Sequence, residues 1–201
     1  MPKAFTESEK KTLKKKLLNS AENLFNRYGL KKTTIKDLTQ AVGISQGAFY
    51  SFFDSKEELY FSILEKEEEK IQNEVLDSKL LEGEITANNL KEFLLNGLKA
   101  ADDSRLLKSL YQNKGDYQQL LRKLPAEQVE SHIKHDKEKL KPLISKLKEE
   151  NKLIDKNPAV ITAVIRSLFL LTLHRKEIGE DIYPETIELI IELVSQGLIK
   201  E

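Results

Sequence analysis

Residues 33–53 read TTIKDLTQAVGISQGAFYSFF, and this stretch decides the fold. Thr34 and Asp37 have the spacing of a capping box, which predicts a short helix that ends at Gly43. Ser45 is a favourable N-cap for a further helix that runs to about Phe53. Two short helices joined at a glycine have the spacing of a helix-turn-helix, a unit whose second helix enters the major groove of DNA.

Helical spacing continues on both sides of this stretch. A long helix precedes it, opened by Thr6-x-x-Glu9 and closed at Gly29, and another starts at the capping box of Ser55 and Glu58. Further helices are predicted over 86–101, 103–112, 115–124, 126–151, 158–179 and 183–199, with a kink or break at Pro142. We therefore predict an all-α fold with a three-helix DNA-binding domain at 1–54, its helix-turn-helix at about 33–52, and a helical domain at 55–201.

Charge is distributed unevenly along the chain. The net charge is zero, yet residues 1–56 hold eleven Lys and Arg against five Asp and Glu, and the remainder is acidic. A basic N-terminal region on an acidic body fits a small DNA-binding unit. The chain has no Cys, which excludes disulfides and thiolate metal sites. Neither a signal peptide nor an uncharged apolar span is recognisable, so we expect a cytoplasmic protein without a membrane partner.

The predicted third helix carries side chains suited to DNA. Gln46 can pair with adenine through two hydrogen bonds, and Gly47 lets the backbone approach the duplex. The Tyr50 hydroxyl suits a phosphate, while Phe49, Phe52 and Phe53 suit the core. The lysine run at 10–16 fits either a solvated helix face or a flank for phosphates. We expect DNA contacts from Thr33, Thr34, Lys36, Ser45, Gln46, Gly47, Ala48, Tyr50, Ser51 and Lys56.

The segment from about Leu17 to Leu64 closely resembles the DNA-binding segment of the TetR family of transcriptional regulators. The resemblance lies in TTIKDL (33–38), AVGIS (41–45), GAFY (47–50) and FFDSKEEL (52–59). It implies a homodimer on a pseudo-palindromic operator, most often a repressor that a small-molecule effector releases. It also gives the C-terminal domain the tasks of effector binding and dimerisation. Ser51 and Phe52 depart from the His, Tyr or Trp common in the family, so base preference does not carry over.

Candidate residues for the remaining tasks lie in the C-terminal domain. An effector pocket is expected to use Tyr60, Tyr111, Gln112, Tyr117 and His132, although each of these also fits an ordinary core or surface position. The almost uniformly apolar helix after Pro158 indicates either core alone or core plus a subunit interface, which the resemblance favours. We expect the interface to include Ile165, Leu168, Phe169, Thr172, Ile187, Ile190, Ile191 and Val194. No cofactor and no metal are predicted.

Two other functions remain open from the sequence. One is a helical adaptor whose helix-turn-helix binds protein instead of DNA, and the basic N-terminal region disfavours it. The other is a metal-assisted hydrolase that uses His132 and His135, which have metal-capable spacing on a helix. No glycine-rich phosphate loop, Cys nucleophile or Ser-His-Asp set supports an enzyme.

Overall fold

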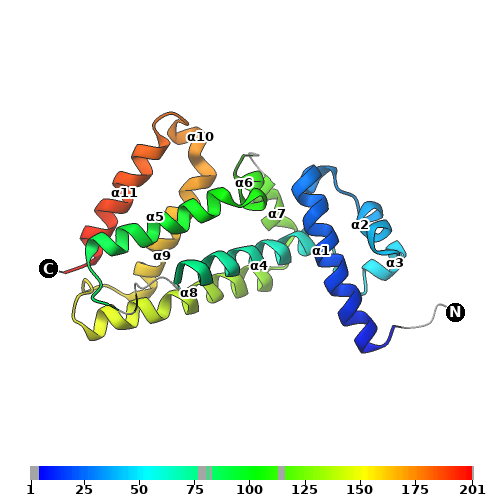
Figure 1. Cartoon of the computed structure of the whole chain (residues 1–201), viewed down its shortest axis with the longest axis horizontal. Coiled ribbons are helices and arrows are strands. Elements are labelled where there is room, and N and C mark those ends of the chain that lie inside the picture. The colour runs from blue at the N-terminus through cyan, green and yellow to red at the C-terminus, as the bar shows by residue number, and fades with distance from the viewer. Residues whose placement is uncertain (1–4, 77–80, 82, 113–115, 201) are drawn as a thin grey trace. The chain divides into compact units, whose positions relative to one another are not determined.

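The computed structural model describes residues 5–76, 81, 83–112 and 116–200, and the chain divides into two compact units. The first comprises Met1–Glu67 with Gln118–Leu124, and the second comprises Glu68–Tyr117 with Pro125–Glu201. Where the structure describes the chain, the elements are helices, apart from an isolated antiparallel bridge between Leu153 and Ile199 (Figure 1). The predicted all-α class is confirmed.

The first unit is built on α1, a long helix that starts at the predicted capping box of Thr6 and Glu9. Gly29, with φ of 76°, interrupts the helical backbone near its end. Two short helices follow, and the unit also takes in the first turns of α4 and most of α7. The bounds are α1 (Glu7–Lys32), α2 (Ile35–Val42), α3 (Gln46–Phe49), α4 (Lys56–Leu76) and α7 (Asp116–Lys123).

The core of the first unit draws on α4 and α7 as well as on α1 to α3. The ring of Phe25 meets Tyr60 edge to face, with ring centroids 4.9 Å apart. Leu59 and Leu64 of α4 and Leu120 of α7 are also buried. The unit therefore extends beyond the boundary predicted after residue 54, because the first turns of α4 supply part of its apolar interior.

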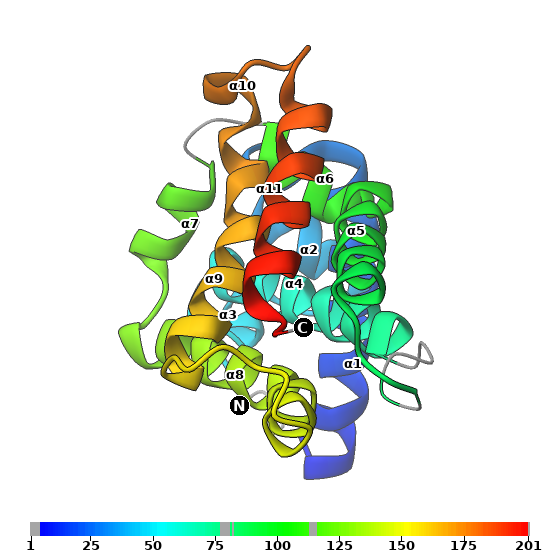
Figure 2. The ribbon, with the colours of Figure 1, turned by 90° about the vertical axis from the view of Figure 1, so that its left-hand side faces the viewer.

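The second unit contains the remaining helices. These are the second part of α4, α5 (Ala87–Asp103), α6 (Arg105–Gln112), α8 (Ala126–Glu149), α9 (Pro158–Leu170), the 3₁₀ helix η2 (Leu171–His174), α10 (Arg175–Ile178) and α11 (Tyr183–Leu198). Helix α11 lies between α5 and α9 (Figure 2). The apolar cluster of the unit is built mainly from α5, α8, α9 and α11, and Leu94, Leu143, Ile165 and Ile191 are among the residues buried in it.

Two helices differ from the sequence prediction. Of the kink or break predicted at Pro142, the break is absent, because α8 continues through the proline, and Leu143, Ile144 and Leu147 after it are buried. The helix predicted from Pro158 to Gly179 is instead divided into α9, η2 and α10. The Thr172 hydroxyl donates to the Phe169 carbonyl at 2.6 Å, a local bond that competes with regular helix.

By length and composition alone, Pro158–Ile178 is apolar enough to cross a membrane.

Candidate nucleic-acid interface and cavity

Local hydrogen bonds fix the turn between α2 and α3. The backbone N–H of Thr34 donates to Asp37 Oδ2 at 2.9 Å, and the Thr34 hydroxyl accepts from the N–H of Asp37 at 3.2 Å. Gly43 closes α2 in the left-handed conformation, with φ of 73°, which glycine adopts without steric cost. The Ser45 hydroxyl then accepts from the N–H of Ala48 and starts α3. The caps predicted from the sequence are all present here.

Most of the predicted DNA-contacting residues lie exposed on α2, α3 and the turn between them. The exposed set comprises Thr34, Lys36, Ser45, Gln46, Gly47, Tyr50 and Ser51, and Ala48 is half-buried. Tyr50 is 55% exposed, although its ring lies edge-on to the buried ring of Phe49. Phe49 and Phe53 are buried, as predicted, and Phe52 is half-buried. The first unit thus presents a polar, amide-bearing face whose aromatic residues anchor it from within.

Two further predicted contact residues, Thr33 and Lys56, are buried or half-buried and donate to carbonyls at the end of α1. Thr33 is only 1% exposed, and its hydroxyl donates to the Gly29 carbonyl at 2.8 Å. The Lys56 ammonium donates to the carbonyls of Leu30 and Thr33 at 2.7 and 2.8 Å. Partial burial lowers the pKa of Lys56, with its neighbour Lys123 acting in the same direction and Glu57 in the opposite one. Both side chains therefore fasten the end of α1, which the sequence pattern did not reveal.

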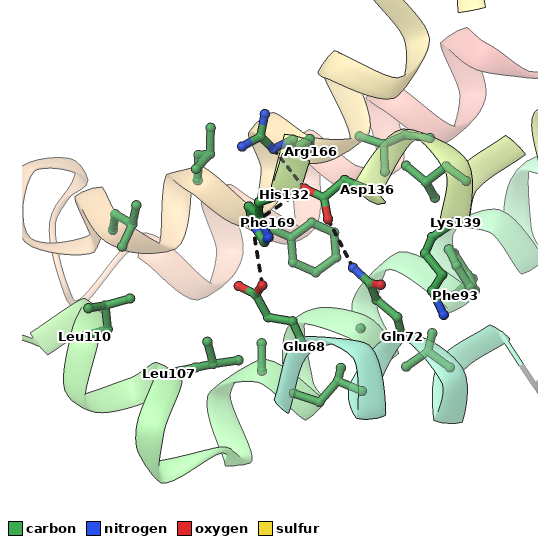
Figure 3. Close-up of a pocket in the computed structure, with 18 of the residues that line it drawn as sticks. Glu68, Gln72, Phe93, Leu107, Leu110, His132, Asp136, Lys139, Arg166 and Phe169 are labelled. Carbon is green, nitrogen blue, oxygen red and sulfur yellow. Dashed lines mark hydrogen bonds and ion pairs between the residues drawn. The ribbon is translucent and has the colours of Figure 1, made fainter. Parts of the chain in front are cut away.

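The second unit contains a cavity of about 170 Å³. Its walls come from the second part of α4, from α5, α6, α8, α9 and η2, and from Tyr117 at the start of α7. Most of the lining is apolar, and it includes Phe93, Leu107, Leu110 and Phe169 (Figure 3). Gly97 makes room for one of these rings, since a Cβ there would lie 3.2 Å from Phe169 Cζ.

One wall of the cavity is polar and charged. Arg166 forms an ion pair with Asp136, with Nε 3.1 Å from Oδ2, and Gln72 Nε2 donates to Asp136 Oδ1 at 3.3 Å (Figure 3). His132 Nε2 lies 3.5 Å from Glu68 Oε2 and 3.9 Å from Asp136 Oδ2. Burial lowers the pKa of His132, with Arg166 and His135 acting in the same direction and Asp136 in the opposite one. Burial, with Glu68 nearby, raises the pKa of the Tyr117 hydroxyl.

The structure brings Tyr117 and His132 together at this cavity, two of the five residues predicted for an effector pocket. Tyr60 instead lies in the core of the first unit, packed against Phe25. The side chains of Tyr111 and Gln112 lie outside the described residues. Sequence reasoning did not assign Glu68, Gln72, Lys139 or Arg166 to a pocket. Arg166 carried a usable signal, because it is the only Lys, Arg, Asp or Glu within α9.

His135 does not join His132 in a metal site. His135 is exposed, whereas His132 is half-buried beside Glu68 and Asp136. Within the described part of the chain, no group of three or more His, Cys, Asp and Glu side chains is placed to hold a metal ion.

The residues predicted for a subunit interface are all buried or half-buried within the protomer. Ile165, Leu168, Thr172, Ile187 and Ile191 are buried within the protomer, whereas Phe169, Ile190 and Val194 are half-buried against its core. The first five are therefore unavailable to a partner in this structure. The large apolar side chains that α9 and α11 expose are Val160, Leu170, Leu189 and Leu193. An almost uniformly apolar helix has no polar stripe to indicate its outer face, so the pattern alone could not separate the two sets.

Comparison with known proteins places residues 17–63 in the family described as bacterial regulatory proteins, tetR family. An HTH-type transcriptional repressor of Mycobacterium tuberculosis is 32% identical over 71 residues, 35% of this chain and 37% of that protein. The repressor KstR2 of Rhodococcus jostii is 41% identical over 63 residues, 31% of each chain. The chain thus matches well under half the length of these curated relatives. They are named for regulating transcription, and neither is named for catalysis.

Solved structures resemble the chain over nearly its whole length. A TetR-family transcriptional regulator from Pectobacterium atrosepticum has a TM-score of 0.76 at 18% identity, covering 98% of this chain and 99% of its own. SmeT, the repressor of a multidrug efflux pump of Stenotrophomonas maltophilia, has a TM-score of 0.61 at 14% identity, covering 94% and 91%. At these identities the likeness establishes the fold.

Proposed function

Because its residues 17–63 belong to the TetR family of bacterial regulatory proteins, we propose that this chain is a transcriptional regulator, a repressor that a small-molecule effector releases from its operator. The observation that carries the proposal is the exposed face of α2 and α3. Gln46, Gly47, Tyr50 and Ser51 face outward there, while Phe49 and Phe53 hold the unit together from inside. A regulator that binds a bacterial chromosome would work in the cytoplasm.

The exposed residues divide into two roles in DNA binding. Gln46 reads sequence, because an amide can pair with the edge of adenine in the major groove. Lys36 and Tyr50 hold the unit in register through phosphates, contacts that are independent of sequence. Lys56, also predicted to contact DNA, has two of its donors committed to carbonyls at the end of α1. We therefore assign Lys56 to holding the unit together.

Helix α4 supports a route between effector and DNA. Its first turns bury Leu59, Tyr60 and Leu64 in the DNA-binding unit, and its later turns place Glu68 and Gln72 on the cavity. An effector that changes the position of the later turns thereby acts on the first ones through a continuous helix. Binding of DNA then weakens binding of the effector, and the reverse, by the same coupling free energy, which is typically about 1–3 kcal/mol.

A homodimer supplies the second DNA-binding unit. Two copies related by two-fold symmetry place two recognition helices on half-sites about one helical turn apart, which matches a pseudo-palindromic operator. We assign the interface to the exposed apolar residues of α9 and α11, namely Val160, Leu170, Leu189 and Leu193.

An electrophoretic mobility-shift titration tests the proposal. The purified protein should retard DNA from upstream of its own gene more strongly than shuffled DNA of the same composition. Gln46→Ala should reduce this discrimination by about 1–3 kcal/mol. Lys36→Ala, the matched control, should weaken both DNAs alike and lower the slope of log affinity against log salt by about one unit. Equal retardation of both DNAs by the unaltered protein at moderate salt would refute sequence-specific regulation and would favour a protein-binding adaptor.

A further inference from the structure

We propose that Lys11 and Lys14 of α1 bind phosphates of the DNA that α3 reads, and that they extend the contact surface beyond α2 and α3. The inference rests on the proposed function, since the ligand is the same duplex. From the sequence, the lysine run at 10–16 fitted both a solvated helix face and a flank for phosphates. The structure separates its members by their place on the helix and by their contacts.

Lys14 lies on the side of α1 that packs against the rest of the first unit. It precedes Leu17 and Leu18 by three and four residues, the spacing of neighbours on one helix face, and both leucines are buried. Lys11 lies one turn before Lys14 on nearly the same side. Lys16, in contrast, is rotated by about 200° from Lys14, because each helical residue adds about 100°. Lys16 therefore points away from the unit.

Two aromatic contacts hold the first turns of α1 beside the end of α3. The ammonium of Lys14 lies 5.2 Å from the centroid of the Phe53 ring, within the range of a cation–π interaction. The ring centroids of Phe5, which precedes α1, and Phe52 are 6.4 Å apart. Phe53 follows the exposed Tyr50 by three residues, a length of chain that spans at most about 10 Å. Duplex DNA carries one charge per about 1.7 Å of its axis, so DNA that contacts Tyr50 brings phosphates near Lys14.

The charges of Lys11 and Lys14 are available to DNA. Both side chains are exposed, and among the described residues neither has an ion pair with an acidic side chain. The acid that follows the N-cap, Glu7, is paired with Lys10 instead, at 2.8 Å. Covering the Phe53 ring requires no charge, since an apolar side chain would cover it as well. Folding therefore leaves the positive charge of Lys14 unexplained, and a phosphate accounts for it.

The salt dependence of DNA affinity tests the role of Lys14. Lys14→Met removes the charge and keeps a flexible apolar side chain against the Phe53 ring. The slope of log affinity against log salt should fall by about 0.9 for each Lys14 that contacts a phosphate. Fluorescence anisotropy of a labelled duplex between about 0.05 and 0.2 M salt measures this slope. Adding Lys11→Met should lower the slope again by a similar amount, and an unchanged slope would remove Lys11 from the surface.

Two variants control for loss of charge and for packing. Lys16→Met removes the same charge from the opposite side of α1 and should keep the slope of the unaltered protein. Lys14→Arg keeps the charge and should also keep that slope. Equal slopes for Lys14→Met and Lys16→Met would overturn the proposal. A slope lowered equally in Lys14→Arg and Lys14→Met would overturn it too, because the change would then act through packing.

Ethylation of DNA phosphates locates the contact on the duplex. Ethylation of the phosphate that Lys14 contacts should weaken binding by the unaltered protein and by Lys16→Met, but not by Lys14→Met. Identical interference patterns for all three proteins would contradict the assignment. Phosphate contacts are independent of sequence, so the salt titration is also made on shuffled DNA. If the protein does not prefer its upstream DNA, sequence-specific regulation fails, whereas the slopes on shuffled DNA still decide the role of Lys14.

Discussion

At the scale of the residue, Gly47 is a position where DNA binding is expected to require glycine although the fold does not. It lies exposed in α3, and a Cβ placed on it would meet only the Ser45 hydroxyl at 3.8 Å, an ordinary contact. Its φ is not in the left-handed region, in contrast to Gly29 and Gly43. Nothing within the described protein therefore requires a glycine at position 47. The requirement is expected from the DNA, where a missing side chain lets the backbone come close.

Gly47→Ala should accordingly weaken operator binding without destabilising the fold. The free energy of unfolding should stay the same or rise by up to about 1 kcal/mol, because alanine favours helix over glycine. Affinity for the operator should fall roughly tenfold, equivalent to about 1.4 kcal/mol of lost contacts. Urea denaturation and mobility-shift titration measure the two quantities. Gly83→Ala, at an exposed glycine of the second unit with equally open surroundings, should change neither; operator affinity unchanged in Gly47→Ala would contradict this role.

Single residues also show where prediction from the sequence reached its limit. Thr33 and Thr34 are adjacent and chemically alike, and the sequence assigned both to DNA. The structure exposes Thr34 at the cap of α2 and buries Thr33, whose hydroxyl bonds to the Gly29 carbonyl. Capping is a local property and was predictable, whereas the burial of Thr33 depends on how α1 and α2 pack.

At the scale of the element, the start of α4 holds the end of α1. The last turn of a helix leaves carbonyls without intrahelical partners, and a cation there satisfies them and interacts favourably with the helix dipole. Lys56 does this across 26 residues of sequence, with its ammonium 2.7 Å from the Leu30 carbonyl and 2.8 Å from that of Thr33. A pairing so distant in sequence leaves no local pattern.

Lys56→Met should therefore destabilise the DNA-binding unit. Methionine keeps much of the aliphatic stem but leaves two partly buried carbonyls without their donor, which should lower the free energy of unfolding by about 1–3 kcal/mol. Chemical denaturation followed by circular dichroism measures the change. Lys36→Met, at an exposed lysine of α2, should stay within about 0.5 kcal/mol of the unaltered protein. Equal free energies of unfolding for the two variants would show that Lys56 does not stabilise the unit and would leave DNA binding as its role.

Element ends and element faces were not equally predictable. The caps at Thr6, Thr34 and Ser45 begin helices as the sequence indicated, since each acts within a few residues. The division of the helix after Leu170 and the continuity of α8 through Pro142 arise from packing and from single side-chain bonds. Local chemistry therefore located the helices, and tertiary contacts decided their interruptions.

At the scale of the whole molecule, the same limit applies to the cavity and the interface. Tyr117 and His132 were expected at a pocket and line the cavity, but Tyr60 shares their polar aromatic character and lies in a different core. The apolar periodicity of α9 and α11 predicted burial without stating which side faces the protomer. The cavity and the interface are made of side chains that the packing of each unit leaves accessible, and that packing is not visible in the sequence pattern.

The exposed apolar face leads to a prediction about assembly. Leu189 and Leu193 are 57% and 59% exposed and lie one helical turn apart on α11, whereas Ile187 and Ile191 of the same helix are buried. A charge at Leu193 would thus leave the protomer core intact while placing an unpaired carboxylate in an apolar interface, which is strongly unfavourable. Leu193→Glu should raise the dimer dissociation constant at least about a hundredfold, as for an interface hot spot. Light scattering at micromolar concentration should then report a monomer.

Operator binding should weaken together with dimerisation. A monomer contacts one half-site, so Leu193→Glu loses the gain in avidity that comes from two linked binding units. Tyr28→Glu provides the control, because it adds the same charge at an exposed aromatic residue of α1, outside α9 and α11, and should remain dimeric. If Leu193→Glu stays dimeric, the interface lies elsewhere than on these apolar residues. If it becomes monomeric with an unchanged melting temperature and circular dichroism spectrum, the face of α11 serves assembly and contributes little to the stability of the protomer.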